Sequence, residues 1–127
     1  MQPPTTLLIV DDDVALCAAY AAVLQTSGYT TLCANTADQA LRILAEHKEV
    51  AIVMTDLHLP QVSGLALLSQ IKAAGHSVPS LLFTGAGEFT HASARAAGVS
   101  AFLVKPIASP ELLRVVSAVL VQNDLAR

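Results

Sequence analysis

Short runs of hydrophobic residues recur along the chain and are separated by segments of helical length. Four runs are too short for helices and are hydrophobic throughout, at residues 7–10, 51–54, 81–83 and 101–104. A fifth run, 29–34, has the β-branched and aromatic residues of a strand nearer an edge. Continuous rather than alternating hydrophobicity predicts strands that are buried on both faces, as in a parallel sheet.

The segments between these runs carry the signals of helix starts and stops. Segment 14–27 follows Asp13, a residue type suited to an N-cap, and precedes Gly28, a residue type suited to a helix stop. The next segment opens with Thr36 and Gln39 at the spacing of a capping box. The remaining limits are expected near His47, at Gly75, at Gly98 and, for the start of the last helix, at Ser109-Pro110-Glu111.

Alternating strands and helices predict an α/β fold in which helices cover both faces of a parallel sheet. We expect a doubly wound sheet of five strands with five helices, in the flavodoxin-like strand order 2-1-3-4-5. The chain of 127 residues suits a single domain spanning 1–127, with its core at 7–121. Residues 122–127 are expected to be a tail or the start of a linker.

Polar side chains stand where the strong strands end. Asp11 and Asp12 follow the first, Asp56 follows the run 51–54 after Thr55, Thr84 follows the run 81–83, and Lys105 follows the last. Ligands of open α/β sheets bind beyond the carboxyl ends of the strands, and all these ends point the same way. We therefore expect three carboxylates, a hydroxyl and an ammonium group to converge there.

Three carboxylates held together repel one another unless a cation neutralises them. Oxygen ligands select a hard cation, and a site with few protein carboxylates suits Mg²⁺ better than Ca²⁺. A carboxylate can also attack phosphorus, with a metal and a lysine offsetting charge on the phosphoryl oxygens. Asp56 is the best-placed nucleophile, because the third strand is expected to be central in the sheet.

Composition narrows the range of partners. There are 10 acidic and 7 basic residues, giving a net charge of -3, and no cluster of Lys and Arg that could follow a nucleic acid backbone. Hydrophobic residues make up 54% of the chain, yet no run approaches the length of a membrane span. The start of the chain lacks the features of a secretory signal. We expect a cytoplasmic protein that binds neither nucleic acid nor membrane directly.

From Leu7 to about Leu120, the chain resembles the receiver domains of two-component response regulators. The resemblance rests on four motifs that occur in the order and with the spacing of that family. They are Val10-Asp-Asp-Asp13, Thr55-Asp-Leu-His-Leu-Pro-Gln-Val-Ser-Gly-Leu65, Phe83-Thr-Gly85 and Ala101-Phe-Leu-Val-Lys-Pro106. Each motif alone is weak evidence, but together they are highly specific.

The resemblance implies a role for each matching residue. Asp56 corresponds to the phosphoacceptor, Asp12 to a direct magnesium ligand, Asp11 to a ligand acting through water, and the backbone carbonyl of His58 to a further ligand.

The remaining matches concern the product and the switch. Thr84 and Lys105 correspond to the residues that bind phosphoryl oxygens, and Pro106 to a cis proline. Phe102 occupies the position of the aromatic switch residue, where Tyr is also common.

A receiver domain is expected to accept its phosphoryl group from a histidine kinase or a phosphotransfer protein, with only slow self-catalysed phosphorylation and dephosphorylation. Its signal is expected to reach an effector domain or protein through the fourth helix, fifth strand and fifth helix, and a homodimer is possible. Two alternatives remain open. One is a haloacid-dehalogenase-type phosphatase, although His58 stands where that class needs a second aspartate, and the other is a phosphorylation-independent scaffold.

The last helix is unusually hydrophobic. In 112–121, eight of ten residues are apolar, which is more than one buried stripe requires. We expect either an exposed apolar patch that marks a partner surface or a helix that the rest of the fold covers well.

Overall fold

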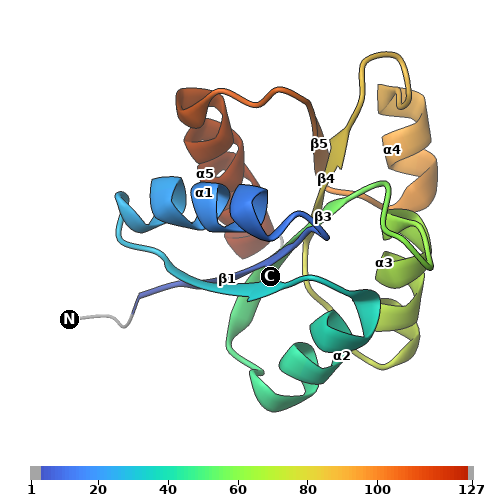
Figure 1. Ribbon diagram of the computed structural model, residues 1–127, viewed down its shortest axis with the longest axis horizontal. Helices are drawn as coiled ribbons and strands as arrows, with labels where there is room; N and C mark the ends of the chain where they lie inside the picture. The colour runs from blue at the N-terminus through green and yellow to red at the C-terminus, as the bar shows by residue number, and fades with distance from the viewer. Residues whose placement is uncertain (1–3, 126–127) are drawn as a thin grey trace.

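The computed structural model of the chain describes residues 4–125, in which five strands and five helices alternate (Figure 1). In chain order the elements are β1 (Thr6–Val10), α1 (Val14–Gln25), β2 (Thr30–Ala34), α2 (Ala37–Glu46), β3 (Val50–Asp56), α3 (Gly64–Ala73), β4 (Ser80–Thr84), α4 (His91–Ala97), β5 (Ala101–Val104) and α5 (Ser109–Leu125). The strands form one sheet in the order β2-β1-β3-β4-β5, and every neighbouring pair is parallel. The predicted fold class and strand order are therefore confirmed.

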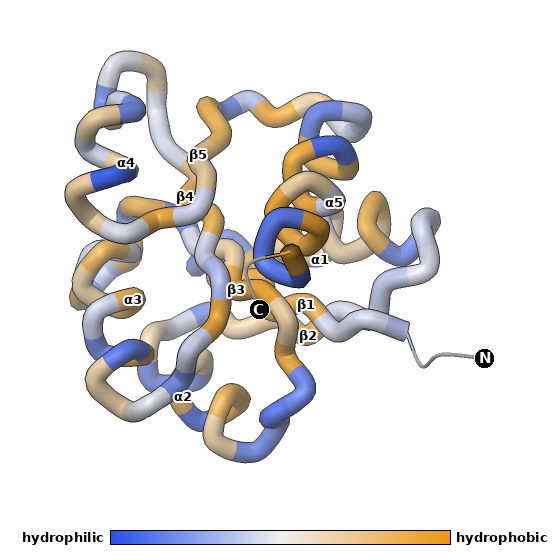
Figure 2. Tube along the Cα trace, turned by 180° about the vertical axis from the view of Figure 1, so that it is seen from behind, coloured by the Kyte–Doolittle hydropathy of each residue, from blue (hydrophilic) through white to orange (hydrophobic). Residues whose placement is uncertain are grey.

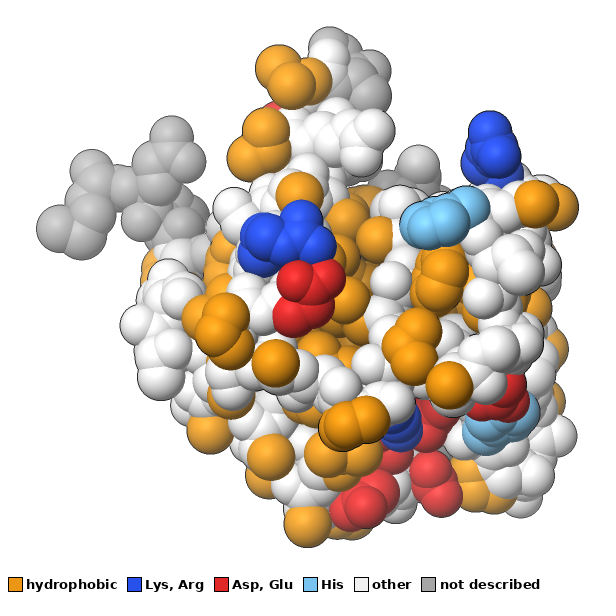
Figure 3. Space-filling view, turned by 90° about the horizontal axis from the view of Figure 1, so that it is seen from above, with side chains coloured by type: hydrophobic (Ala, Val, Ile, Leu, Met, Phe, Trp, Pro, Cys, Tyr) orange, Lys and Arg blue, Asp and Glu red, His pale blue; other side chains and the backbone are white. Residues whose placement is uncertain are grey.

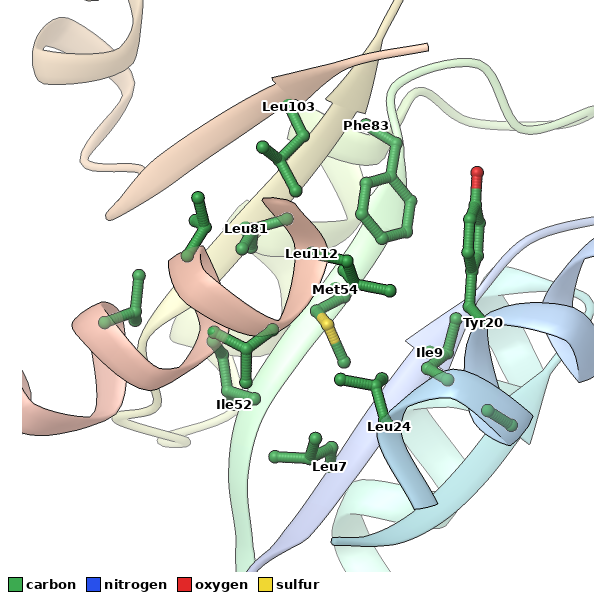
Figure 4. Close-up of a cluster of buried hydrophobic side chains, with 14 of the residues drawn as sticks. Leu7, Ile9, Tyr20, Leu24, Ile52, Met54, Leu81, Phe83, Leu103 and Leu112 are labelled. Carbon is green, nitrogen blue, oxygen red and sulfur yellow. The ribbon is translucent and has the colours of Figure 1, made fainter. Parts of the chain in front are cut away.

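Helices cover both faces of the sheet, and successive strand residues face different helices. Leu7 and Ile9 of β1 belong to a core cluster with residues of α1 and α5, whereas Leu8 and Val10 pack with residues of α2 and α3. Figure 4 shows the first cluster, with side chains of the sheet meeting Leu112 of α5. Both faces of β1, β3 and β4 are thus buried, which explains their unbroken hydrophobicity, coloured orange in Figure 2. The edge strands β2 and β5 are partly exposed, so the prediction of a strand buried on both faces is wrong for 101–104, where Val104 is 44% exposed.

Two strands reach further than their hydrophobic runs. Asp56 is the last residue of β3 and pairs with Phe83, and Thr84 is the last residue of β4 and pairs with Val104. The backbone ladder does not depend on side-chain polarity, so pairing continues into the polar residues that follow each run. Each of these residues is consequently fixed by the sheet itself rather than by a loop.

The helix starts follow the expected capping chemistry. The Asp13 carboxylate accepts a hydrogen bond from Leu16 N at 3.1 Å, and the Thr36 hydroxyl accepts one from Gln39 N at 3.1 Å. The Gln39 side chain reaches back to Asn35 N, at 2.8 Å. Asp13 is therefore an N-cap, as its sequence position suggested, and does not belong with the acidic residues at the sheet end.

The last helix is mostly covered. Its buried apolar residues are Leu112, Val115, Val116 and Val119, with Leu113 and Leu120 packed partly against the same core. The large apolar residues of α5 that remain exposed are Val121, at 56%, and Leu125, at 81%. Of the two expectations, a helix that the rest of the fold covers applies to most of α5, and exposure of its large apolar residues is limited to the end of the helix.

Helix α5 also runs through residues that were expected to form a tail or linker, since it continues to Leu125. The last two residues of that segment, 126–127, lie outside the described part of the chain. Within residues 4–125, no helix is both long enough and apolar enough to cross a membrane.

Candidate functional site

The carboxyl ends of four strands bring five polar side chains to one end of the sheet. They are Asp11 and Asp12 directly after β1, Asp56 at the end of β3, Thr84 at the end of β4 and Lys105 directly after β5. Figure 3 shows acidic side chains gathered beside a basic one at the lower edge of the view. The structure thus places these residues where the strand pattern predicted.

Three carboxylates form a compact group. Oxygen atoms of Asp11, Asp12 and Asp56 all lie within 4.8 Å of one another. Asp11 is only 1% exposed and Asp56 8%, whereas Asp12 is exposed. Backbone amides orient the two buried carboxylates, because Asp13 N donates to Asp11 Oδ1 at 2.9 Å and His58 N donates to Asp56 Oδ1 at 3.1 Å.

Lys105 completes the group from the far end of the sequence. Its Nζ lies 2.9 Å from Asp56 Oδ2 and 3.5 Å from Asp11 Oδ2, although Asp11 is 94 residues away in the chain. The peptide bond between Lys105 and Pro106 is cis, as the family resemblance implied. The ammonium group therefore bridges two acidic side chains at the carboxyl end of β5.

Burial and charge act against each other in this group. Burial raises the pKa of Asp11, and the hydrogen bond from Asp13 N and the charge of Lys105 only partly offset it. Burial alone would lower the pKa of Lys105, but the hydrogen bond to Asp56 and the negative charges of Asp11 and Asp56 raise it. Lys105 is therefore held in its charged form. Its single positive charge offsets only part of the negative charge of the three carboxylates.

The donor set suits a hard divalent cation. It offers carboxylate oxygens from three residues, with no thiol among them, and one of the three carboxylates is open to solvent. Such a set is typical of Mg²⁺, which keeps part of its water shell and uses few protein ligands. The residues present therefore fit magnesium, although the ring of His58 takes no part in this group.

Thr84 reaches the sheet end, where its hydroxyl bonds to the backbone of β5. Its side chain is buried, and its hydroxyl donates to the carbonyl oxygen of Leu103 at 3.4 Å. The hydroxyl therefore joins β4 to the backbone of β5 in this conformation. Its binding of a phosphoryl oxygen stays a prediction.

Phe102 is partly buried and faces the opposite side of β5 from Leu103, because the two residues pack in different core clusters. Its ring makes an edge contact with Phe89, with ring centroids 5.3 Å apart, and lies 5.2 Å from the ring of His91. Both neighbours belong to the segment between β4 and α4 or to the start of α4. Phe102 therefore packs directly against elements that follow Thr84 in the chain.

One residue at this end of the molecule was not found by sequence reasoning. The carboxylate of Glu88 contacts Nε2 of His58 and accepts a hydrogen bond from Gly85 N at 2.6 Å. Glu88 lies in a loop, so neither strand ends nor helix caps mark it. The only signal in the sequence is an acidic residue shortly after Thr84, which is too common to indicate a role.

Comparison with known proteins is consistent with this geometry. The family model of the response regulator receiver domain matches residues 7–117. The transcriptional regulatory protein GlrR of Escherichia coli (strain K12) is 31% identical over 121 residues, which cover 94% of this chain and 27% of that protein. The response regulator MprA of Mycobacterium sp. (strain KMS) is 32% identical over 121 residues, covering 92% of this chain and 51% of that protein.

Solved structures agree on the fold. NtrX from Brucella abortus superposes with a TM-score of 0.89 at 31% identity, covering 98% of this chain and 28% of that one. A receiver domain protein from Clostridium thermocellum gives a TM-score of 0.88 over 97% of this chain and 99% of that one, and its 24% identity supports the fold alone.

This chain matches only one part of these longer relatives, because it spans about a quarter of GlrR and about half of MprA. The family model nevertheless covers most of the sequence, including every strand end that carries a site residue. The chain belongs to the response regulator receiver domain family.

Proposed function

We propose that this domain is a signalling switch that accepts a phosphoryl group on Asp56 from a phosphohistidine of a histidine kinase or phosphotransfer protein in the cytoplasm. The observation that carries the proposal is the position of Asp56. Its carboxylate ends the central strand, with Oδ1 held by His58 N and Oδ2 2.9 Å from Lys105 Nζ. A carboxylate so oriented is a suitable nucleophile for phosphorus.

The chain's own groups account for the transfer. An oxygen of Asp56 attacks phosphorus, the P–N bond to the donor imidazole breaks, and the imidazole nitrogen keeps the electron pair and takes a proton. Lys105 offsets negative charge on the phosphoryl oxygens, as preorganised cations do in phosphoryl transfer. Asp11, Asp12, Asp56 and the backbone carbonyl of His58 would hold Mg²⁺, which supplies further charge compensation when bound.

The signal would be read on the face formed by α4, β5 and α5. Thr84 would leave the Leu103 carbonyl to bind a phosphoryl oxygen, and Phe102 would move with it. A groove of about 420 Å³ lies on this face, lined by residues that include His91, Phe102, Val104, Ile107 and Glu111. An effector domain or protein bound there would sense the phosphorylation state, and a homodimer through the same face stays a prediction.

Labelling with a small phosphodonor tests the proposed function. Phosphoramidate carries the same P–N bond as phosphohistidine, so we expect it to add one phosphoryl group to the protein when Mg²⁺ is present and none when the metal is chelated. Intact-protein mass spectrometry measures the label, hydroxylamine should release it as an acyl phosphate, and peptide mapping should place it at Asp56.

Two other results would contradict the proposal. A folded protein that takes no label at any Mg²⁺ concentration would favour the scaffold. Sustained release of phosphate from phosphomonoesters would favour the haloacid-dehalogenase-type phosphatase.

The neighbouring aspartates provide a matched test of the metal site. We expect Asp12→Asn to weaken Mg²⁺ binding by about tenfold or more, because it removes a charged ligand oxygen from a small donor set. Asp13→Asn should bind Mg²⁺ as the unmodified protein does, since Asp13 caps α1 and lies outside the group of three carboxylates. Calorimetric titration measures both affinities, and equal losses in the two variants would contradict the assignment.

A further inference from the structure

Glu88 connects the two loops that border Asp56. One loop, 57–63, follows β3, and its His58 N donates to the Asp56 carboxylate. The other, 85–90, follows Thr84. The Glu88 carboxylate contacts His58 Nε2 in the first loop with Oε2 and accepts the hydrogen bond from Gly85 N in the second with Oε1. In Figure 3 a histidine and an acidic side chain lie together beside the acidic group.

Two hydrogen bonds favour the charged form of Glu88, and the charge of Asp56 has only a small opposing effect on it. The hydrogen bond from His58, followed by that from Gly85 N, lowers the pKa of Glu88, whereas the negative charge of Asp56 acts in the opposite direction. Glu88 is therefore a charged carboxylate near the proposed phosphoacceptor. Further negative charge on Asp56 would repel it.

The backbone at residue 85 is shaped to receive this carboxylate. A Cβ atom at Gly85 would overlap with Oε1 of Glu88 and lie 3.0 Å from its Cδ. Only a residue without a side chain leaves the carboxylate room to reach the amide. The contact thus depends on both Gly85 and Glu88 of this loop.

Glu88 directly precedes a residue that packs on the proposed switch aromatic. The next residue, Phe89, packs edge-on against Phe102, and both belong to a small core cluster with Leu82, Ala94 and Val99. A movement of Glu88 that includes its backbone would also move Phe89, the next residue in the chain. A continuous set of contacts therefore runs from the surroundings of Asp56 to the ring of Phe102.

We propose that Glu88 is a positioning residue that closes the Asp56 site in the unphosphorylated protein, and that phosphorylation releases it and moves Phe89 against Phe102. The inference rests on the proposed phosphorylation of Asp56. Phosphorylation replaces the single negative charge of the Asp56 carboxylate with the roughly two charges of a phosphoryl group, a net gain of about one negative charge that stands further out from the strand end. Repulsion then drives Glu88 from the Gly85 amide and separates the two loops, whereas in the unphosphorylated state its charge and position hinder an anionic donor.

Three substitutions separate the effect of the Glu88 charge from the effect of its contact with His58. Glu88→Ala removes both the charge and the bridge, Glu88→Gln removes the charge at nearly constant size, and His58→Ala breaks the bridge but keeps the carboxylate. The matched control is Glu49→Ala, which removes the other exposed histidine–glutamate pair, between His47 and Glu49 at 3.2 Å. That pair lies before β3, at the opposite end of the strand from Asp56.

The first measurement is the rate of labelling by phosphoramidate with Mg²⁺. We expect Glu88→Ala and Glu88→Gln to be labelled faster than the unmodified protein, on the order of threefold, because a like charge near the incoming donor is removed. His58→Ala should be accelerated less, and Glu49→Ala not at all. The rate at which the label is lost should change less than the labelling rate, because the site is already open once phosphorylated.

The second measurement is made by NMR. In the Glu88→Ala variant the Gly85 amide should exchange its hydrogen faster than in the unmodified protein. The shift of the Phe102 ring signals on adding beryllium fluoride, a phosphoryl mimic, should be smaller. Faster Gly85 exchange only confirms that the hydrogen bond from Gly85 N is lost, whereas the Phe102 response reports coupling, which a purely structural loss of an exposed ion pair would not change.

The outcomes distinguish failure of the proposed phosphorylation of Asp56 from failure of the proposed role of Glu88. If the unmodified protein takes no label, the proposed function fails and the role of Glu88 fails with it. If the unmodified protein is labelled but Glu88→Ala matches it in labelling rate, Gly85 exchange and Phe102 response, the role of Glu88 alone is overturned.

Discussion

The Asp56→Asn variant is expected to take no phosphoryl group from phosphoramidate under conditions that label the unmodified protein. Asparagine preserves the size of the side chain, but its amide lacks the nucleophilic carboxylate oxygen. The fold should survive, because Lys105 Nζ keeps Asp11 as a charged partner at 3.5 Å. Mass spectrometry after incubation with the donor measures the loss, and circular dichroism checks the fold.

The control for this experiment is again Asp13→Asn, which changes an acid only a few residues from the site but should be labelled normally. Label retained in Asp56→Asn would contradict the assignment of the acceptor. Label that moves to Asp12 would show that the carboxylates are interchangeable, which the orientation of Asp56 by His58 N and Lys105 argues against.

The Gly64→Ala variant is expected to fold less stably and to be labelled about a hundredfold more slowly. A Cβ at residue 64 would overlap with the backbone oxygen of Asp56 and lie 3.1 Å from its carbonyl carbon and from Leu57 Cα. Backbone atoms cannot yield as a flexible side chain can, so Asp56 must shift. Overpacking costs about 1–3 kcal/mol, and a misplacement of about 1 Å can reduce a rate by roughly 100-fold.

Urea unfolding and labelling rates measure these two effects separately. Gly75→Ala is a suitable control, because a Cβ there meets nothing within 4 Å, although its positive φ of 90° makes alanine strained. That strain should cost about 1–2 kcal/mol of unfolding free energy without slowing the labelling. Normal labelling of Gly64→Ala would contradict the view that the close approach of α3 fixes Asp56.

Much of the site could be predicted because the backbone alone decides it. The unbroken hydrophobic runs implied parallel strands, and parallel strands must deliver their following residues to the same edge. This reasoning applies to Asp11, Asp56 and Lys105, which converge as expected. The N-cap role of Asp13 was equally local, since it depends on the residue type directly before a helix.

The rest depends on side-chain conformations and on contacts between distant loops. The hydroxyl of Thr84 could turn toward Asp56 or toward Leu103, and the strand pattern does not distinguish the two directions. Glu88 reaches His58 only because two loops that are 30 residues apart lie side by side. The apolar content of α5 likewise does not reveal how much of the helix the neighbouring elements cover.

The register of β3 has a consequence for the precision of the site. Met54 and Val53 face different helix layers, and β3 is paired with β1 on one edge and β4 on the other. A slip of one residue would exchange the side chains of the strand between the two helix layers and place Asp56 out of line with Lys105. The accuracy with which the reactive oxygen is held is therefore set by the free energy of the hydrophobic interior, and mutations far from the carboxylates should impair function by loosening that alignment.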